Sequence, residues 1–170
     1  MRNDADSQSA SITRRIRCLL LTLFVGLVAS GATAIPLEME LKLLVQIIGT
    51  DTNPHQTNLI GWLVKVRDAV VDTNARHPFM AYGTDWLAFG HFVIAISFIG
   101  ALRDPVRNVW IVEFGMIACV LVVPFALIMG GVRGIPLGWR IIDCSFGVIG
   151  FIPLWFCRRL ITRLIELNAK

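Results

Sequence analysis

The chain has 170 residues, of which 55% are hydrophobic and only 16% are charged, and its mean hydropathy is +0.67. Soluble domains carry about 25% charged residues, so this composition indicates a membrane protein with room for one compact domain. The formal net charge of +4 comes from 16 basic and 12 acidic residues. These charges cluster at the edges of apolar runs, which is typical of membrane topology and does not indicate nucleic-acid binding.

Residues 1–34 allow two interpretations. Three arginines precede an apolar run from Cys18 to Val28, and small residues follow up to Ala34. A basic region, a short apolar region and an A-x-A site are typical of a cleaved signal peptide, and Gly31 favours this interpretation. The run from Ile16 to Ile35 is also just long enough to remain as a signal anchor, a membrane-spanning helix. Both interpretations place the residues that follow outside the cytoplasm.

Residues 35–85 are too polar to span a membrane and predict two amphipathic helices. From Leu37 to Asp85 there are six acidic and four basic residues, a net charge of −2. The first helix is expected to end at Gly49, with its apolar residues at helical spacing: Leu37, Leu41, Leu44 and Ile48. The second helix is expected to start with a capping box at Asn53, Pro54 and Gln56 and to run to about Thr73.

Three membrane-spanning helices are predicted at about 86–102, 109–130 and 137–156, with a cytoplasmic basic tail at 158–170. Asp104 is expected to cap the middle helix, with Pro105 at its first position. The predicted fold class is therefore an all-α membrane protein. It comprises a three-helix transmembrane bundle, an N-terminal signal peptide or fourth anchor helix, and an extracytoplasmic amphipathic helical pair.

The arginines predict the orientation of these helices. They stand at every second predicted boundary, in three groups: Arg14, Arg15 and Arg17; Arg103 and Arg107; and Arg158, Arg159 and Arg163. Because positive charge favours the cytoplasmic side, the C-terminus is expected to be cytoplasmic. Arg133 and Arg140, in the loop on the opposite side, count against this topology. Four tryptophans support the predicted boundaries of the spans. Each lies within a few residues of one boundary, as tryptophans at a membrane interface do: Trp86, Trp110, Trp139 and Trp155.

The stretches "YGTDWLAFGHFVIAI", "LRDPVRN", "EFGMIAC" and "WRIIDCSFG" lie between Tyr82 and Cys157. In these stretches the chain resembles uncharacterised small bacterial inner-membrane proteins. The resemblance covers under half of the chain and implies a membrane class and a bacterial inner (plasma) membrane, with no activity attached.

Ionisable residues inside a span cost several kcal/mol unless they are paired or hydrated, so each needs a partner or a role. His91 lies five residues past Trp86 and Asp143 lies four past Trp139. At 1.5 Å per residue, both sit about 6–8 Å below the outer interface. Small residues on each helix, Ala88 and Ala95 beside His91, Gly147 and Gly150 beside Asp143, predict close helix contact. We therefore expect His91 and Asp143 to face each other, with Arg140 as a second partner of the carboxylate.

Glu113 lies near the opposite, cytoplasmic interface, where Arg158 and Arg159 are expected to pair with it. The remaining candidate chemistry is weaker. His55 and His77 lie outside the spans, so a bis-histidine haem is not favoured. Ser145 and Asp143 point in different directions around their helix, which disfavours a nucleophile beside the acid. The four cysteines form no C-x-x-C pair: Cys18, Cys119, Cys144 and Cys157. No metal, cofactor or disulfide framework is therefore expected.

These patterns favour a non-enzymatic integral membrane protein that binds partners through residues 37–85. The expected partners are the lipid bilayer and either copies of the chain or another membrane protein, because so few helices make a poor solute pathway alone. The alternative is a proton- or ion-conducting transporter subunit that uses His91 and Asp143, since histidine titrates near neutral pH.

Overall fold

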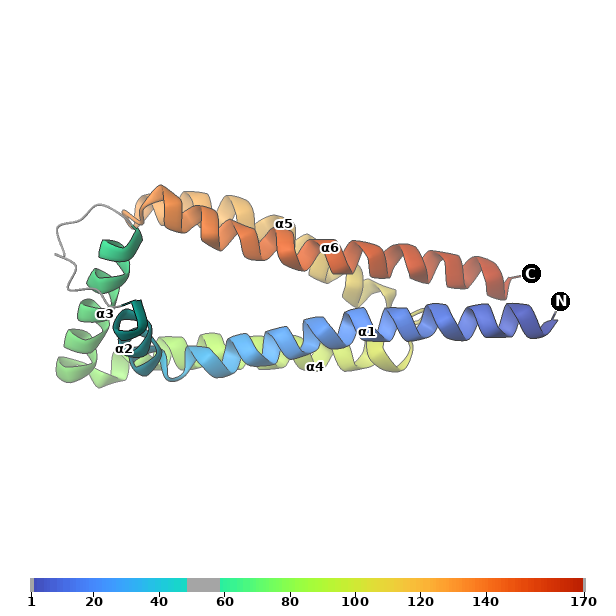
Figure 1. The fold of residues 1–170 in the computed structure, drawn as a ribbon, viewed down its shortest axis with the longest axis horizontal. Helices are drawn as coiled ribbons and strands as arrows, with labels where there is room; N and C mark the ends of the chain where they lie inside the picture. Colours follow the sequence, from blue (N-terminus) through green and yellow to red (C-terminus); the bar gives the residue numbers. More distant parts are fainter. Residues whose placement is uncertain (1, 49–58, 170) are drawn as a thin grey trace. The chain divides into compact units, whose positions relative to one another are not determined.

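The computed structural model describes residues 2–48 and 59–169, and these residues form helices with no strand among them (Figure 1). The helices are α1 (Arg2–Ala34), α2 (Leu37–Ile48), α3 (Leu59–Arg76), the short 3-10 helix η1 (Pro78–Ala81), α4 (Tyr82–Arg103), α5 (Val109–Val132) and α6 (Leu137–Asn168). Within this part of the chain, four segments are long and apolar enough to cross a membrane: Ser7–Ala34, Pro78–Arg103, Val109–Val132 and Leu137–Asn168. The predicted all-α membrane fold is confirmed, and the chain is a multi-pass membrane protein.

Two helices are longer than the sequence predicts. α4 begins at Tyr82, four residues before the predicted start of its span, and α6 continues through the predicted basic tail to Asn168. The extension of α6 has a packing reason. Ile161 and Leu164 follow the buried Cys157 at helical spacing and are themselves 0% and 4% exposed. The tail is therefore a part of the helix that contributes to the core.

The middle span starts later than Asp104. Asp104 Oδ1 accepts a hydrogen bond from the backbone N–H of Arg107 at 3.0 Å, and the Asp104 carbonyl accepts one from the N–H of Asn108 at 3.1 Å. These bonds close a turn over residues 105–108, and α5 begins after it at Val109. Asp104 thus caps the turn, whereas the N-cap of α5 is Asn108. The predicted capping box at residues 53–56, and the predicted end of α2 at Gly49, lie outside the described residues.

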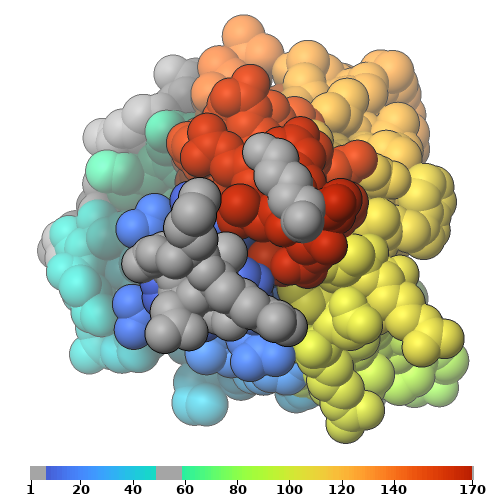
Figure 2. All heavy atoms as spheres, turned by 90° about the vertical axis from the view of Figure 1, so that its right-hand side faces the viewer, coloured from blue at the N-terminus to red at the C-terminus, as the bar shows by residue number. Residues whose placement is uncertain are grey.

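The chain divides into two compact units, and parts of α1 and α4 belong to each. The bundle unit comprises Met1–Leu27 and Val93–Lys170, and the α2–α3 unit comprises Val28–Phe92. In the bundle unit α5 and α6 lie side by side (Figure 1). Figure 2 shows one end of this unit, where the C-terminal part of α6 lies beside the first part of α1 and the connection between α4 and α5.

The core of the bundle unit lies at this end and is built from four helices. Its buried residues are Ile12, Ile16 and Leu20 of α1, Phe98 and Ala101 of α4, Val112 of α5, and Leu154, Cys157, Ile161 and Leu164 of α6. Arg17 of α1 fixes the neighbouring helix end, because its Nε donates to the carbonyl of Leu102 at 3.2 Å. The predicted N-terminal segment is therefore part of the folded core of this structure.

α5 and α6 approach each other through glycines. A Cβ added at Gly147 would meet the backbone carbonyl of Cys119, and one added at Gly150 would meet the Cys119 Sγ. Gly115 of α5 fits against Leu154 in the same way. Small residues allow this backbone contact, which drives helix association in lipid, where burial from water contributes little. Large apolar residues instead remain exposed around the pair, among them Phe125 at 69% and Ile149 at 64%, as expected of surfaces that face acyl chains.

The glycine contact yields a stability prediction. Gly147→Ala places a methyl group against a backbone carbonyl that cannot move alone, so we expect it to lower the free energy of unfolding by about 1–3 kcal/mol. Gly26→Ala is the matched control, because nothing lies within 4 Å of the added Cβ. The control should leave stability unchanged or raise it by up to about 1 kcal/mol. Denaturant titration in detergent micelles measures both variants, and equal stability of the two would contradict the assigned contact.

Candidate functional site

His91 lies on a face of α4 that packs against α1 in the α2–α3 unit. Its Nδ1 is 2.8 Å from the carbonyl oxygen of Leu87, one turn earlier. Gly31 of α1 lies against this face, since an added Cβ would meet the Ala88 carbonyl at 3.0 Å and the His91 Cβ at 3.1 Å. Because Gly31 has no side chain, α1 can approach α4 closely beside His91. Gly31, which favours signal-peptide cleavage in the sequence, is a contact point between two helices.

Asp143 belongs to the bundle unit. The glycines on its face of α6, Gly147 and Gly150, pack against Cys119 of α5. Within the described part of the chain, no ion pair or side-chain hydrogen bond engages the Asp143 carboxylate. His91 and Asp143 belong to different units, and their predicted pairing remains a prediction.

The structure gives Arg140 another contact. Its Nε donates to the carbonyl oxygen of Ile135 at 2.6 Å. The side chain lies over Gly130 and Gly131, where the absence of side chains leaves room for it. Among the described residues no bond joins Arg140 to Asp143. Arg140 thus binds the turn between α5 and α6, which is a structural reason for a positive charge in the loop that counted against the predicted topology.

Glu113 and Arg158 join α5 to α6 by an ion pair. Arg158 Nε donates to Glu113 Oε1 at 2.7 Å. A second guanidinium nitrogen of Arg158 donates to the Thr162 hydroxyl, also at 2.7 Å. Arg159 takes a different place, because its guanidinium lies 4.0 Å from the centroid of the Trp155 ring, in a cation–π contact. The two neighbouring arginines therefore have different partners.

The surface with the strongest features for binding lies on α2. Leu41 and Val45 are buried, whereas Met39, Leu43 and Ile47 are 67%, 55% and 72% exposed. The exposed three recur every four residues, so they form one stripe on the face opposite Leu41 and Val45. We call these three residues the α2 stripe. α2 therefore has two apolar faces, of which one packs inside its unit and the other is uncovered.

The sequence points only partly to this arrangement. The predicted apolar set included Leu44 and Ile48, which are 44% and 40% exposed, and it omitted Val45, which is 4% exposed. The α2 stripe was missed because Met39 lies in a stretch where apolar and charged residues alternate. The sequence signal for the α2 stripe is a second series of apolar residues spaced four apart, which is offset from the predicted apolar set.

A groove of about 800 Å³ adjoins the α2 stripe. It is lined mainly by apolar side chains of α2, α3 and η1, including Leu37, Met39, Val66, Val70 and Met80. Polar residues of the same elements complete the lining of the groove. An apolar centre with a polar border is the usual composition of a protein-binding surface.

Glu38, Lys42 and Asn74 form the polar border of the groove. The Asn74 amide of α3 donates to Glu38 Oε2 at 2.8 Å, and Lys42 forms an ion pair with the other carboxylate oxygen. The hydrogen bonds from Lys42 and then from Asn74 lower the pKa of Glu38, so the carboxylate keeps its charge and its bonds to both helices at neutral pH. Within the described residues, no three His, Cys, Asp or Glu side chains gather so as to hold a metal ion.

No protein-family model matches the chain, and no curated protein or solved structure matches it. The case for a function therefore rests on the geometry of the chain itself.

Proposed function

We propose that the protein is a non-enzymatic component of the bacterial inner membrane that binds a protein partner through the α2 stripe and the adjoining groove. The partner is a second membrane protein or another copy of the chain. The observation that carries this proposal is the uncovered apolar stripe of Met39, Leu43 and Ile47 on a helix of 12 residues, which is too short to span the membrane.

The exposed area on α2 differs from the exposed apolar surface of the long helices. Exposure on α5 or α6 is explained by acyl chains around a span. α2 has only 12 residues and carries Glu38, Glu40 and Lys42 in its first half. Its exposed stripe continues into a groove with a charged border, and fixed polar groups around an apolar centre favour a protein over lipid as occupant.

The arginine groups support the orientation in which both ends of the chain are cytoplasmic. Arg17 bonds to the end of α4 near Arg103, and Arg15 and Arg163 line one hollow. All three groups predicted from the sequence thus occur at one end of the bundle unit. By the positive-inside rule we assign this end to the cytoplasm, and α1 to a retained fourth membrane helix, because its buried residues complete the core.

We expect the double substitution Leu43→Gln and Ile47→Gln to abolish partner binding, because it removes the apolar stripe without touching the buried face. The double substitution Phe125→Gln and Ile128→Gln on α5 is a matched control, since both residues are more than 60% exposed but lie in a span. Native mass spectrometry after purification in mild detergent measures the complex. The wild type and the control should carry the second chain and the α2 variant should not. A wild type that is only monomeric contradicts the proposal.

The unpaired Asp143 favours a second candidate, the proton- or ion-conducting subunit, because an ionisable group within a span needs a partner or a role. Asp143→Asn keeps the size and hydrogen-bonding capacity of the side chain and removes its charge. If the Asp143 carboxylate takes part in proton or ion conduction, the wild type in liposomes shows a pH-dependent flux of protons or ions, and the variant loses this flux. Absence of flux from the wild type would end this candidate, while assembly through the α2 stripe stays testable in both proteins.

A further inference from the structure

Three arginines at one end of the bundle unit form no ion pair with any residue that the structure describes. Among the described residues, no ion pair engages Arg14, Arg15 or Arg163. All three side chains are exposed and belong to the two helices, α1 and α6, that meet at this end. Other arginines of the chain do have partners, such as Arg158 on Glu113 and Arg76 on Asp72. Among the described residues, this end therefore presents positive charge that no ion pair neutralises.

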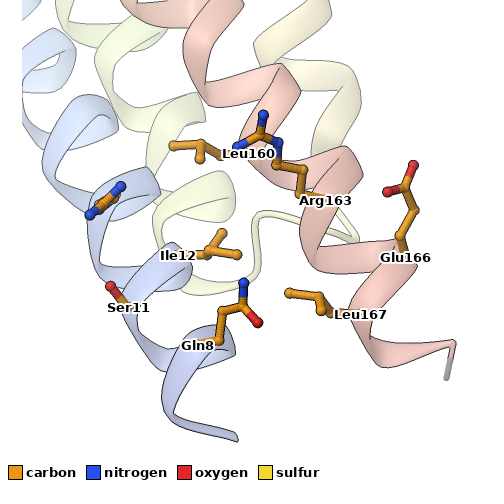
Figure 3. Close-up of a pocket in the computed structure, with 8 residues that line it drawn as sticks. Gln8, Ser11, Ile12, Leu160, Arg163, Glu166 and Leu167 are labelled. Carbon is orange, nitrogen blue, oxygen red and sulfur yellow. The ribbon is translucent and has the colours of Figure 1, made fainter. Parts of the chain in front are cut away.

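Two of these arginines line a hollow between α1 and α6. It has a volume of about 460 Å³ and is lined by Gln8, Ser11, Ile12 and Arg15 of α1 and Leu160, Arg163, Glu166 and Leu167 of α6. Figure 3 shows Ile12 and Leu167 pointing toward each other from the two helices. The carboxylate of Glu166 is turned away from these side chains (Figure 3), and the lining carries two arginines against this one acid.

A second hollow continues from the first. It has a volume of about 440 Å³, shares Arg15 and Leu160 with the first, and is otherwise lined by Arg14, Cys18, Leu19 and Phe156. On both helices these residues lie one turn closer to the middle of the predicted span. The two hollows together thus offer guanidinium groups at the end of the helices and an apolar wall on the membrane side.

We propose that this groove between α1 and α6 binds an anionic phospholipid, with its phosphate at Arg15 and Arg163 and an acyl chain along Leu19 and Phe156. Guanidinium groups match phosphate oxygens in charge and hydrogen-bond geometry. Basic pockets between membrane helices on the cytoplasmic side bind such head groups. The apolar hollow beside the arginines favours a lipid over free phosphate, because free phosphate has no apolar group that could contact these side chains. The Gln8 amide and the Ser11 hydroxyl supply further donors at the polar end.

The proposal rests on retention of α1, since α1 forms one side of the groove. It is independent of the α2 stripe, which lies in the other unit. The test uses the full chain in detergent micelles, and its intact mass confirms that residues 1–34 are present. A chain that begins after Ala34 has no groove, and this outcome overturns the proposal without involving partner binding.

The experiment titrates phosphatidylglycerol against phosphatidylcholine of the same acyl chains and counts bound lipids by native mass spectrometry. We expect selective binding of phosphatidylglycerol, and we expect Arg15→Gln with Arg163→Gln to weaken it by about 30-fold. Arg103→Gln with Arg107→Gln is the matched control, because it removes two positive charges from the same end outside the groove. The control should keep most of the affinity, and added salt should weaken binding to the wild type.

Several outcomes overturn the proposal. Equal retention of the two lipids shows that no anionic site exists. An equal loss in the control shows that net charge alone attracts the lipid. Competition by inorganic phosphate at the same concentration as the lipid shows a phosphate site without lipid selectivity. Because all four substituted arginines are exposed and outside the core, far-ultraviolet circular dichroism should show unchanged helix content in both variants.

Discussion

The core that α1, α4, α5 and α6 share is the interaction on which the bundle unit depends. Ile16 and Leu20 of α1 and Cys157 and Ile161 of α6 are all 0% exposed, although most large apolar side chains on the long helices are uncovered. Burial of an aliphatic side chain of this size contributes about 1.5–3 kcal/mol where water is the alternative. The core lies at the end of the bundle unit that carries the arginines.

The two helix pairs of the bundle unit are held by different physical means. α5 and α6 associate through glycines that bring the backbones together and through the Glu113–Arg158 pair. α1 and α6 meet where the apolar core continues beyond the predicted span. This division leaves the rest of each helix to face acyl chains. The arginines of α1 and α6 line hollows at the rim of their contact.

Hydropathy was sufficient to predict the spans, because a helix needs about 20 successive apolar residues to cross the hydrocarbon core of a membrane. Hydropathy did not show that the helix continues where charge interrupts the apolar pattern. Residues 158–170 contain Arg158, Arg159 and Arg163 and were predicted as a basic tail, and Ile161 and Leu164 continue the buried face of α6 in this segment. Depth estimates placed His91 and Asp143 at one level, and because the two residues belong to different units, their pairing remains a prediction. The small residues beside them contact Gly31 of α1 and Cys119 of α5, which their spacing alone does not reveal.

The same core bears on the fate of residues 1–34. A signal peptide and a membrane anchor have the same basic and apolar regions, so the pattern up to Ala34 is compatible with both, and the burial of Ile16 and Leu20 supports our proposal that the helix is retained. Intact mass spectrometry of the mature protein from its native membrane tests this most directly. A retained α1 gives a mass near the 18.9 kDa of the full sequence. A chain that begins at Ile35 would contradict the account, because the core would lose one of its four helices and the hollows between α1 and α6 would lose one of their two sides.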